Sequence, residues 1–316
     1  MSSELDLIAE FLKPFPRGGR GVVIGPGSDC AAVRPSRGKL LVAKTDAVVE
    51  GVHFDLVRFA PEDVGWKALA VNLSDLAAAG AQPRWFLCAL GVPRRAPRAL
   101  QVARRIARGM ASLARASGCA LIGGNVTSAR EWSVTILALG DARRPLERSG
   151  AKAGDAVVVI GKLGDAAAGL RALRAKAQLR GPALKAAVSA QRTPHALVAE
   201  GVRAAAFASA SVDVSDGFLR DLGHLCTASK VGAVVECSAL PLGLGARALP
   251  DGMELALTGG EDYALVLTVP RARLARLQRA VRCVEVGRIV KGRGIHLTEL
   301  GQPRPLPLVA GFDHLR

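Results

Sequence analysis

A set of acidic residues lies beside glycines or at the ends of apolar runs, where carboxylates could do chemistry. They are Asp29 in GSDCA, Asp46 in AKTDAV, Asp75 in VNLSDLAAAGA, Asp213, Asp216 and Asp221 in VDVSDGFLRDLGH, and Glu261 and Asp262 in TGGEDY. A carboxylate among apolar neighbours is costly unless it is paired, caps a helix or binds a metal ion. Taken singly, each is explained by a turn or a cap: a turn at Asp29, and caps at Asp46, at Asp75 and at Asp213 or Ser215.

As a set, these acids have the composition of a ligand set for a hard cation. Thr and Ser lie beside them, and no cluster of His and Cys accompanies them. Mg²⁺ prefers oxygen ligands and acts together with substrate phosphates. Because the acids are spread over both halves of the chain, we predict a magnesium site in a cleft between two domains. The sequence has no GxxxxGK[ST], HRD or DFG motif, which excludes a P-loop enzyme and a protein kinase.

The stretch CALIGGNVTS combines an apolar run with two glycines and an amide. The run over residues 119–122 stops at Gly123 and Gly124, and Asn125 follows at once. We interpret this as a strand that ends in glycines, where bare backbone lets a phosphate or a metal ion come close. An amide oxygen can coordinate a metal ion but neutralises none of its charge, so Asn125 stands where a carboxylate is the natural ligand.

Helices and strands alternate in both halves of the chain and must position these residues. Helices are predicted over 5–13, 61–80 and 97–117, and strands over 40–43, 85–93, 120–124 and 132–140. The polar stretch over 141–155 is typical of a linker, so we predict domains at 1–145 and 146–316. In the second domain VDVSDG leads from a strand edge into a helix, and TGGEDY is a glycine turn before a strand. This mixture predicts an α+β fold.

Length and composition bound the remaining possibilities. The chain has 316 residues, half of them hydrophobic, which is enough for two domains with their own cores. Apolar stretches are too short for a membrane span, and the N-terminus has no signal-peptide pattern. The six cysteines are scattered in mostly apolar surroundings, as in a reducing compartment. We therefore expect a cytoplasmic protein.

The net charge of +16 has two interpretations, a nucleic-acid-binding surface or an Arg-rich sequence bias. The basic residues recur at helical spacing with apolar residues between them, as in RRIARGMASLARA, which is typical of solvated helix faces. Aromatic residues make up only 4%, which is little material for stacking on bases. An anionic small-molecule substrate is therefore favoured over nucleic acid.

The chain resembles the thiamine-monophosphate kinase family over essentially its whole length, from about Leu7 to His314. The resemblance rests on GPGSDCA, KTDAVVEGVHF, NLSDLAAAGAQPRW, LIGGN, ERSGAKAGDAVVV, VDVSDGFLRDLGHL, LTGGEDYALV and the terminal GFDHL, in that order and spacing. Single motifs are shared with aminoimidazole ribonucleotide synthetase, selenophosphate synthetase and a hydrogenase-maturation protein of the same superfamily. The combination of NLSDLAAAGA, VDVSDG, TGGEDY and GFDH is much more specific to the thiamine enzyme.

The resemblance implies a two-domain α+β fold whose N-terminal mixed sheet dimerises and whose active site lies in the cleft between the domains. It implies that ATP phosphorylates thiamine monophosphate to thiamine diphosphate with the help of several Mg²⁺ ions. Motif matches assign metal binding to Asp29, Thr45, Asp46, Asp75, Asp213 and Asp216, nucleotide contacts to Gly124, Asn125, Arg148 and Ser215, and thiamine contacts to His53, Glu261 and Phe312. Asp46, Asp75, Asp213 and Arg148 are the expected catalytic residues. For His53 a structural hydrogen bond, and for Phe312 a hydrophobic plug, remain alternatives.

The chain departs from the family pattern at several positions. Gly-Gly-Asn-Val stands at 123–126 where the family usually has GGDT, and Ser28 replaces an acid. Lys44 precedes Thr-Asp where a small hydroxyl residue is usual, and a tyrosine often found before the glycines is missing. In one explanation the site is rewired: Lys44 contacts nucleotide phosphates and replaces part of one Mg²⁺, which compensates for Asn125. In the other, the chain is a catalytically weakened paralogue that binds nucleotide or thiamine phosphates.

Hypotheses of three classes follow from these residues. The first is a thiamine-phosphate kinase, which would form ADP only with Mg²⁺ and thiamine monophosphate. The second is a superfamily enzyme with another phosphate acceptor, although the sequence lacks the reactive N-terminal Cys segment of a selenophosphate synthetase. The third is a binding protein that ATP or thiamine diphosphate stabilises without turnover.

Overall fold

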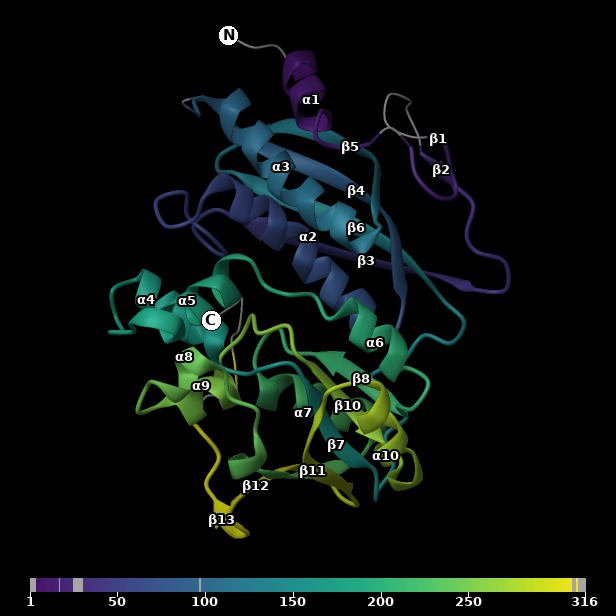
Figure 1. The fold of residues 1–316 in the computed structure, drawn as a ribbon, viewed down its shortest axis with the longest axis vertical. Coiled ribbons are helices and arrows are strands. Elements are labelled where there is room, and N and C mark those ends of the chain that lie inside the picture. The colour runs from purple at the N-terminus through teal and green to yellow at the C-terminus, as the bar shows by residue number, and fades with distance from the viewer. Residues whose placement is uncertain (1–3, 17, 25–30, 97, 309–310, 312–316) are drawn as a thin grey trace. The chain divides into compact units, whose positions relative to one another are not determined.

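The computed structural model describes residues 4–16, 18–24, 31–96, 98–308 and 311, and it divides into two compact units (Figure 1). Unit 1 comprises Met1–Leu76 and Ala81–Arg143, and unit 2 comprises Ala77–Gly80 and Arg144–Arg316. The division after Arg143 falls inside the polar stretch that the sequence marks as a linker. In the described part of the chain, no helix is both long and apolar enough to cross a membrane.

Unit 1 is built around a four-stranded mixed sheet. Its strand order is β3 (Leu40–Val49), β6 (Ser133–Ala142), β4 (Gln82–Pro93) and β5 (Ala120–Ala129). β4 and β5 run parallel, and the other neighbours run antiparallel. The helices are α1 (Glu4–Leu12), α2 (Pro61–Ala78) and α3 (Ala99–Ser117), and β1 (Val22–Ile24) pairs with β2 (Ala32–Val33).

The two faces of this sheet differ, because successive side chains of a strand point to opposite sides. α2 and α3 lie over one face (Figure 1), where Phe86, Cys88 and Ile136 are almost completely buried. On the other face Leu137 and Ala89 are exposed. The two helices approach each other closely, since a Cβ atom at Gly65 of α2 would lie 1.8 Å from the carbonyl oxygen of Ile106 in α3.

Strands β3 and β5 of unit 1 continue five or more residues beyond the ends that the sequence predicts. β3 does not end at residue 43 but continues through Thr45 and Asp46 to Val49, and β5 continues through Gly123 and Gly124 to Ala129. The glycines therefore lie inside a strand and do not end it. The reason is the close approach of β4: a Cβ atom at Gly124 would lie 1.9 Å from the carbonyl oxygen of Cys88.

Unit 2 contains a seven-stranded sheet. Its order is β13 (Gln302–Arg304), β12 (Gly294–Glu299), β9 (Gly232–Glu236), β11 (Val284–Val290), β7 (Ala156–Ile160), β10 (Leu265–Val269) and β8 (Ala210–Asp213). β12 and β9 are parallel, and the other neighbours are antiparallel. All five residues of β7 and of β10 are buried, because cores form on both faces of the sheet.

The helices of unit 2 cover both faces. They are α4 (Asp165–Leu173), α5 (Gly181–Arg192), α6 (Val198–Ala204), α7 (Phe218–Ser229), the 3₁₀ helix η1 (Cys237–Ala239), α8 (Leu244–Arg247), α9 (Gly252–Thr258) and α10 (Arg271–Ala280). α7 and α9 contribute Phe218 and Leu257 to one core, and α6 and α10 contribute Ala204 and Leu277 to the other. The sequence does not predict α5 and α6, and α5 supplies a residue of the candidate site.

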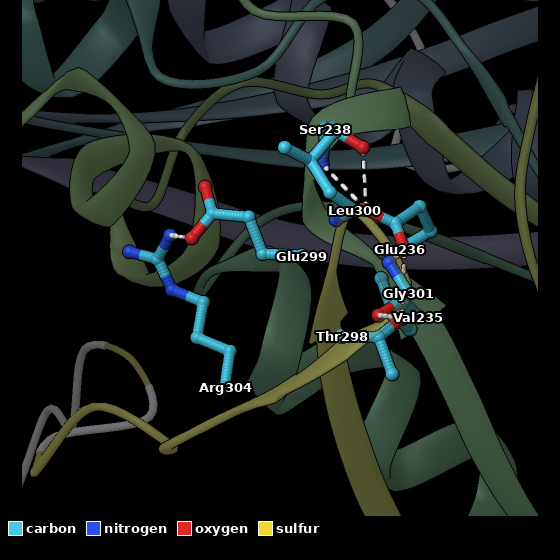
Figure 2. A network of polar contacts seen from close by, with 8 residues as sticks. All are labelled: Val235, Glu236, Ser238, Thr298, Glu299, Leu300, Gly301 and Arg304. Atoms are coloured by element: carbon cyan, nitrogen blue, oxygen red, sulfur yellow. Dashed lines mark hydrogen bonds and ion pairs between the residues drawn. The ribbon is translucent and has the colours of Figure 1, made fainter.

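A carboxylate at the end of β9 fixes the turn between β12 and β13. Figure 2 shows Glu236 accepting hydrogen bonds from the backbone amides of Leu300 and Gly301, at 2.8 and 3.1 Å, and from the Thr298 hydroxyl at 2.9 Å. The Ser238 hydroxyl and amide donate to it as well. The Ser238 bond, followed by the amides and Thr298, lowers the pKa of Glu236 to about 2.

Candidate active site

In unit 1, three charged residues meet on the helix-covered face of the sheet. The Lys44 ammonium in β3 lies 3.1 Å from Oδ2 of Asp75 in α2 and 3.8 Å from Oδ2 of Asp46. All three side chains are partly exposed. Oδ1 of Asp46 accepts a hydrogen bond from the amide of Ala47 at 2.7 Å. Asp46 and Asp75 therefore converge on one cation. Asp46 lies inside β3 and Asp75 in the last turn of α2, so neither occupies the N-cap position of a helix.

Thr45 and His53 are held by the backbone around them. The Thr45 hydroxyl donates to the carbonyl of Ile136 at 3.0 Å, and alternation along β3 places Thr45 on the opposite face from Lys44 and Asp46. Nδ1 of His53 accepts a hydrogen bond from the amide of Val49 at 3.1 Å. That bond leaves the proton of a neutral His53 on Nε2. The structural role foreseen as an alternative for His53 is therefore present.

Asn125 is separated from the acids of unit 1. It is exposed on β5, the edge strand opposite β3, and it pairs with Ala89 on the face that α2 and α3 do not cover. Gly124 and Asn125 line two neighbouring hollows of about 140 and 510 Å³. The walls of the larger one are mostly apolar and include Leu87 and Leu137. Within one chain, Lys44 thus does not lie beside Asn125.

In unit 2, the loop between β8 and α7 is organised by one carboxylate. Oδ2 of Asp221 accepts hydrogen bonds from the amides of Ser215, Asp216 and Gly217, at 3.0, 3.0 and 3.2 Å. Asp213, the last residue of β8, is 3% exposed. The predicted side-chain cap from Asp213 or Ser215 is wrong: the N-cap of α7 is Gly217, and Asp221 reaches back to the amides.

Asp216 belongs to a charged cluster with Asp221 and His224. One ligand atom from each of the three lies within 4.8 Å of the others, a geometry that could hold a metal ion. Burial, and then the positive charges of Arg148 and Arg220, lower the pKa of His224, while Asp216 opposes them. Burial, together with the negative charge of Asp216, raises the pKa of Asp221 to about 6 although the three amides oppose the shift. Arg148 and Asp216 are thus brought to the same region.

The TGGEDY turn between α9 and β10 lies against this loop. The Glu261 amide donates to the carbonyl of Ser215 at 2.7 Å, and the Tyr263 amide donates to that of Val214 at 2.8 Å. Oε2 of Glu261 accepts a hydrogen bond of 2.6 Å from the side-chain amide of Gln191 in α5. The nucleotide candidate Ser215 and the thiamine candidate Glu261 are therefore neighbours.

Asp262 anchors the same turn to the start of α4. Its carboxylate accepts hydrogen bonds from the amides of Gly164 and Ala166, at 2.6 and 3.1 Å. Burial, together with the nearby charges of Asp165 and Glu261, raises its pKa to about 7 although these two bonds oppose the shift. Its role here is to fix the loop that carries Glu261.

Two predicted residues, Asp29 and Phe312, lie outside the described residues. The preceding Gly311 is described, and it packs against the loop after β8: a Cβ atom there would lie 2.6 Å from the carbonyl oxygen of Asp216.

Two residues of the site, His224 and Gln191, are not predicted from the sequence. His224 follows Asp221 by nearly one helical turn in VDVSDGFLRDLGH, a spacing that places both on one helix face. Gln191 has no such signal.

The residues present fit a divalent cation such as Mg²⁺. In unit 1, the Lys44 ammonium marks a position where two carboxylates already face one positive charge. In unit 2, Asp213 and Asp216 flank a loop fixed by Asp221, and carboxylate oxygens are the ligands that Mg²⁺ prefers. The donor set is therefore that of a hard cation.

Comparisons with known proteins agree with these two units. The model of the AIR synthase related protein N-terminal domain matches residues 27–142, and that of the C-terminal domain matches 152–299. A thiamine-monophosphate kinase of Salmonella typhimurium is 38% identical over 95% of this chain and 90% of its own. The crystal structure of thiamine-monophosphate kinase from Stenotrophomonas maltophilia is 34% identical, with a TM-score of 0.83 over 96% of this chain and 98% of that one. The structure of AaThiL complexed with AMPPCP and TMP has a TM-score of 0.79 at 30% identity, over 98% of this chain and 95% of that one.

Proposed function

Because the chain belongs to the thiamine-monophosphate kinases of the AIR synthase related family, we propose that it transfers the γ-phosphoryl group of ATP to thiamine monophosphate. The products are thiamine diphosphate and ADP, and the reaction is a step of thiamine diphosphate biosynthesis. The similarity to named kinases over nearly the full length of both chains supports this activity, as does the related structure with AMPPCP and TMP.

The observation that carries the proposal is the convergence of Asp46 and Asp75 on one cation in unit 1. The acceptor in this reaction is an anionic phosphate oxygen, so no general base has to remove a proton. The barrier comes mainly from repulsion between two polyanions and from their alignment. Cations held by the chain are what such a reaction needs.

Asp46, Asp75, Asp213 and Asp216 would hold Mg²⁺, and by resemblance Asp29 and Thr45 would contribute. When bound, Mg²⁺ neutralises phosphate charge and aligns the reacting oxygens. The chain itself positions these ligands. Asp221 accepts hydrogen bonds from the amides of residues 215–217 and so keeps Asp216 oriented. Thr45 would act through its backbone, because its hydroxyl is bonded to Ile136.

Arg148 and Lys44 are the cations that we assign to the nucleotide phosphates. Arg148 is exposed, and its positive charge reaches His224 next to Asp216. A guanidinium there would stabilise the charge that spreads over the transferring group. Ser215 and the bare backbone at Gly124, with Asn125, would complete the nucleotide contacts.

Glu261, His53 and Phe312 are assigned to the thiamine moiety. A carboxylate such as Glu261 attracts the positively charged thiazolium ring or pairs with the aminopyrimidine. An aromatic ring such as Phe312 is suited to stack on a cationic ring. For His53, the bond from the Val49 amide to Nδ1 fixes the orientation of the imidazole ring that would meet the substrate.

The chain is further proposed to act as a homodimer through the uncovered face of the unit 1 sheet. That face exposes Leu137 and Ala89, and an apolar face of this kind is normally covered by a partner.

The compartment we propose is the cytoplasm, and the free thiols of Cys88, Cys119, Cys226, Cys237 and Cys283 support a reducing environment.

The decisive experiment measures thiamine diphosphate formation from ATP and thiamine monophosphate across a Mg²⁺ titration. Turnover that requires all three components is the expected result. ADP formed only with another acceptor would instead identify a superfamily relative. Stabilisation by ATP or thiamine diphosphate without turnover would identify a weakened paralogue, and activity restored by Asn125→Asp would trace that weakness to the amide.

A further inference from the structure

The positive charge of the chain is concentrated in one segment of unit 2. Residues 271–293, which include α10 and β11, contain eight basic residues and one acid, so this segment carries +7 of the net charge of +16. Five exposed arginines on and between these two elements form what we call the basic surface. They are Arg273, Arg276, Arg279, Arg282 and Arg288.

Helix α10 presents its basic side chains to solvent. Leu274 and Leu277 are buried in the core on one face of the unit 2 sheet. Arg276 and Arg279 lie on the opposite side of the helix and are exposed. The guanidinium of Arg276 lies over the ring of Phe207, 5.8 Å from its centroid, and this contact favours one orientation of the arginine.

Strand β11 adds Arg288 to the same surface. Arg288 pairs with Ala156 of β7, and Ala156 belongs to the core under α10. Because directly opposite residues of neighbouring strands point to the same face, Arg288 lies on the α10 side of the sheet. An ion pair of 2.6 Å between Glu285 and Arg271 joins β11 to α10 on this side.

The basic surface carries an excess of positive charge that the chain does not balance. Glu285 is the acid of the segment, and it is already paired with Arg271. Within the described residues, no ion pair joins an arginine of the basic surface to a carboxylate. Like charges gathered on one surface repel one another, and a polyanion bound there relieves the repulsion. The surface is therefore complementary to a polyanion.

The exposed groups distinguish between classes of polyanion. Over residues 271–283, all of them described, no large apolar side chain is exposed, so none is available to insert into a membrane. Single-stranded nucleic acid is bound by aromatic rings that stack on bases, and here the ring of Phe207 is covered by Arg276. Duplex RNA is recognised in part through its 2′-hydroxyls, whereas the exposed residues between the arginines of α10 are alanines apart from Gln278. Guanidinium groups without such partners suit the phosphates of a DNA duplex.

We propose that the basic surface of unit 2 docks double-stranded DNA through its phosphates, without reading the base sequence. This contact goes beyond the proposed phosphoryl transfer and does not depend on it, because none of the five arginines belongs to the candidate active site. Contacts to phosphates alone give weak binding, with a Kd on the order of 10⁻⁶–10⁻⁴ M at physiological salt. The protein would thus associate reversibly with DNA of any sequence.

The test measures how DNA binding depends on salt. Fluorescence anisotropy of a labelled DNA duplex gives the association constant at several KCl concentrations. With about four phosphates contacted, its logarithm should fall with the logarithm of the salt concentration at a slope of about −4. In the variant with Arg276→Gln, Arg279→Gln and Arg282→Gln, the slope should shrink to about −1. Lysines at the same three positions keep the charge and should retain most of the slope.

A control variant removes the same charge from unit 1. It carries Arg94→Gln, Arg95→Gln and Arg130→Gln, three exposed arginines, and should keep the native slope. Equal loss in the two glutamine variants would overturn the proposal, because net charge alone would then explain binding. So would salt-independent or undetectable binding by the native chain. If the α10 variant fails to fold, Arg279→Glu compared with Arg95→Glu makes the same distinction.

Two further ligands separate DNA from the other polyanions. They are an RNA duplex of the same sequence and vesicles of equal parts phosphatidylserine and phosphatidylcholine. At the same salt concentration, both should bind more weakly than the DNA duplex. Tighter binding of the RNA would identify an RNA-binding surface, and tighter binding of the vesicles a membrane-binding one. Either result would overturn the assignment to DNA.

Discussion

The Lys44 ammonium lies 3.1 Å from Oδ2 of Asp75 and so joins strand β3 to helix α2 on the covered face of the unit 1 sheet. Asp46 lies 3.8 Å from the same nitrogen. A lysine thus occupies the position of a cation between two carboxylates proposed as metal ligands. The charge it supplies is single and covalently attached, whereas Mg²⁺ would supply two charges and several coordination positions.

Replacing Lys44 by Met should make unit 1 depend more on divalent cations. Without the ammonium, Asp46 and Asp75 repel each other, and removing a partly exposed ion pair costs about 1 kcal/mol or less of stability. Without the competing ammonium, the two carboxylates should then bind Mn²⁺ about tenfold more tightly than in the native chain, which corresponds to about 1.4 kcal/mol. Electron paramagnetic resonance of Mn²⁺ without nucleotide measures this directly. Turnover should fall and recover in part at higher Mg²⁺.

Lys39→Met is the matched control for that prediction. Lys39 pairs with Asp141 at 2.7 Å, but Arg84 lies 3.1 Å from the same carboxylate and remains after the substitution. Mn²⁺ affinity should therefore stay at the native value. If Lys44→Met and Lys39→Met bind Mn²⁺ alike, Lys44 does not occupy a cation position.

Lys44 and Asn125 should act independently within one chain. They lie on the two outer strands of a four-stranded sheet and on opposite faces of it. Three strand spacings alone separate them by about 14 Å, and the register adds an offset along the strands, because Asn125 is level with Ala47 and not with Lys44. A double-mutant cycle with Lys44→Met and Asn125→Asp, read as Mn²⁺ affinity, should give a coupling energy below about 0.5 kcal/mol. A coupling well above this value would restore the idea that one substitution compensates for the other.

The sequence predicts well those features that depend on local patterns. Pro61 and the acids after it mark the start of α2, and the spacing of apolar residues marks α3. The end of β5 is mispredicted because glycine disfavours a strand locally, whereas Gly124 is required by the approach of Cys88. Tertiary contact, which a single sequence does not display, outweighs the local preference there.

The candidate site shows the same contrast between residues that a local pattern marks and contacts that only the tertiary structure reveals. The acids could be identified because carboxylates beside apolar runs stand out, and Asp216 does lie near Arg148 and Ser215 near Glu261. The partners of these acids could not be identified from the sequence, because they are distant along the chain. Lys44 and Asp75 are 31 residues apart, and Gln191 and Glu261 are 70 residues apart. The cap on the loop after β8 comes from Asp221 because a carboxylate one turn into α7 reaches three amides at once.

Glu236 should make a pH-dependent contribution to the stability of unit 2. Its pKa is about 2 in the folded chain, below its usual 4.5, because Ser238, the turn amides and Thr298 stabilise the charged form (Figure 2). A depressed pKa means that the stabilisation is complete above about 4.5 and is lost as the pH falls toward 2. The difference in Tm between native chain and Glu236→Gln should therefore be largest at neutral pH and vanish in acid. A difference that does not change with pH would contradict this assignment.

Two glycine substitutions should change stability in opposite directions. At Gly124 a Cβ atom would lie 1.9 Å from the backbone oxygen of Cys88, so Gly124→Ala must separate β4 from β5. We expect a loss of at least about 2 kcal/mol, because overpacking against backbone has no side chain that can move aside. At Gly223, inside α7, the nearest atom to a Cβ would be 4.0 Å away, so Gly223→Ala should stabilise by about 0.5–1 kcal/mol through helix propensity.

Urea unfolding of both variants tests the pair. Because Asn125 follows Gly124 directly, Gly124→Ala should also weaken nucleotide binding, whereas Gly223→Ala should leave it unchanged. If Gly124→Ala is as stable as the native chain, β5 does not pair with β4 through Gly124. The strand would then end at the glycines, as the local pattern alone predicts, and Asn125 would lie in a loop.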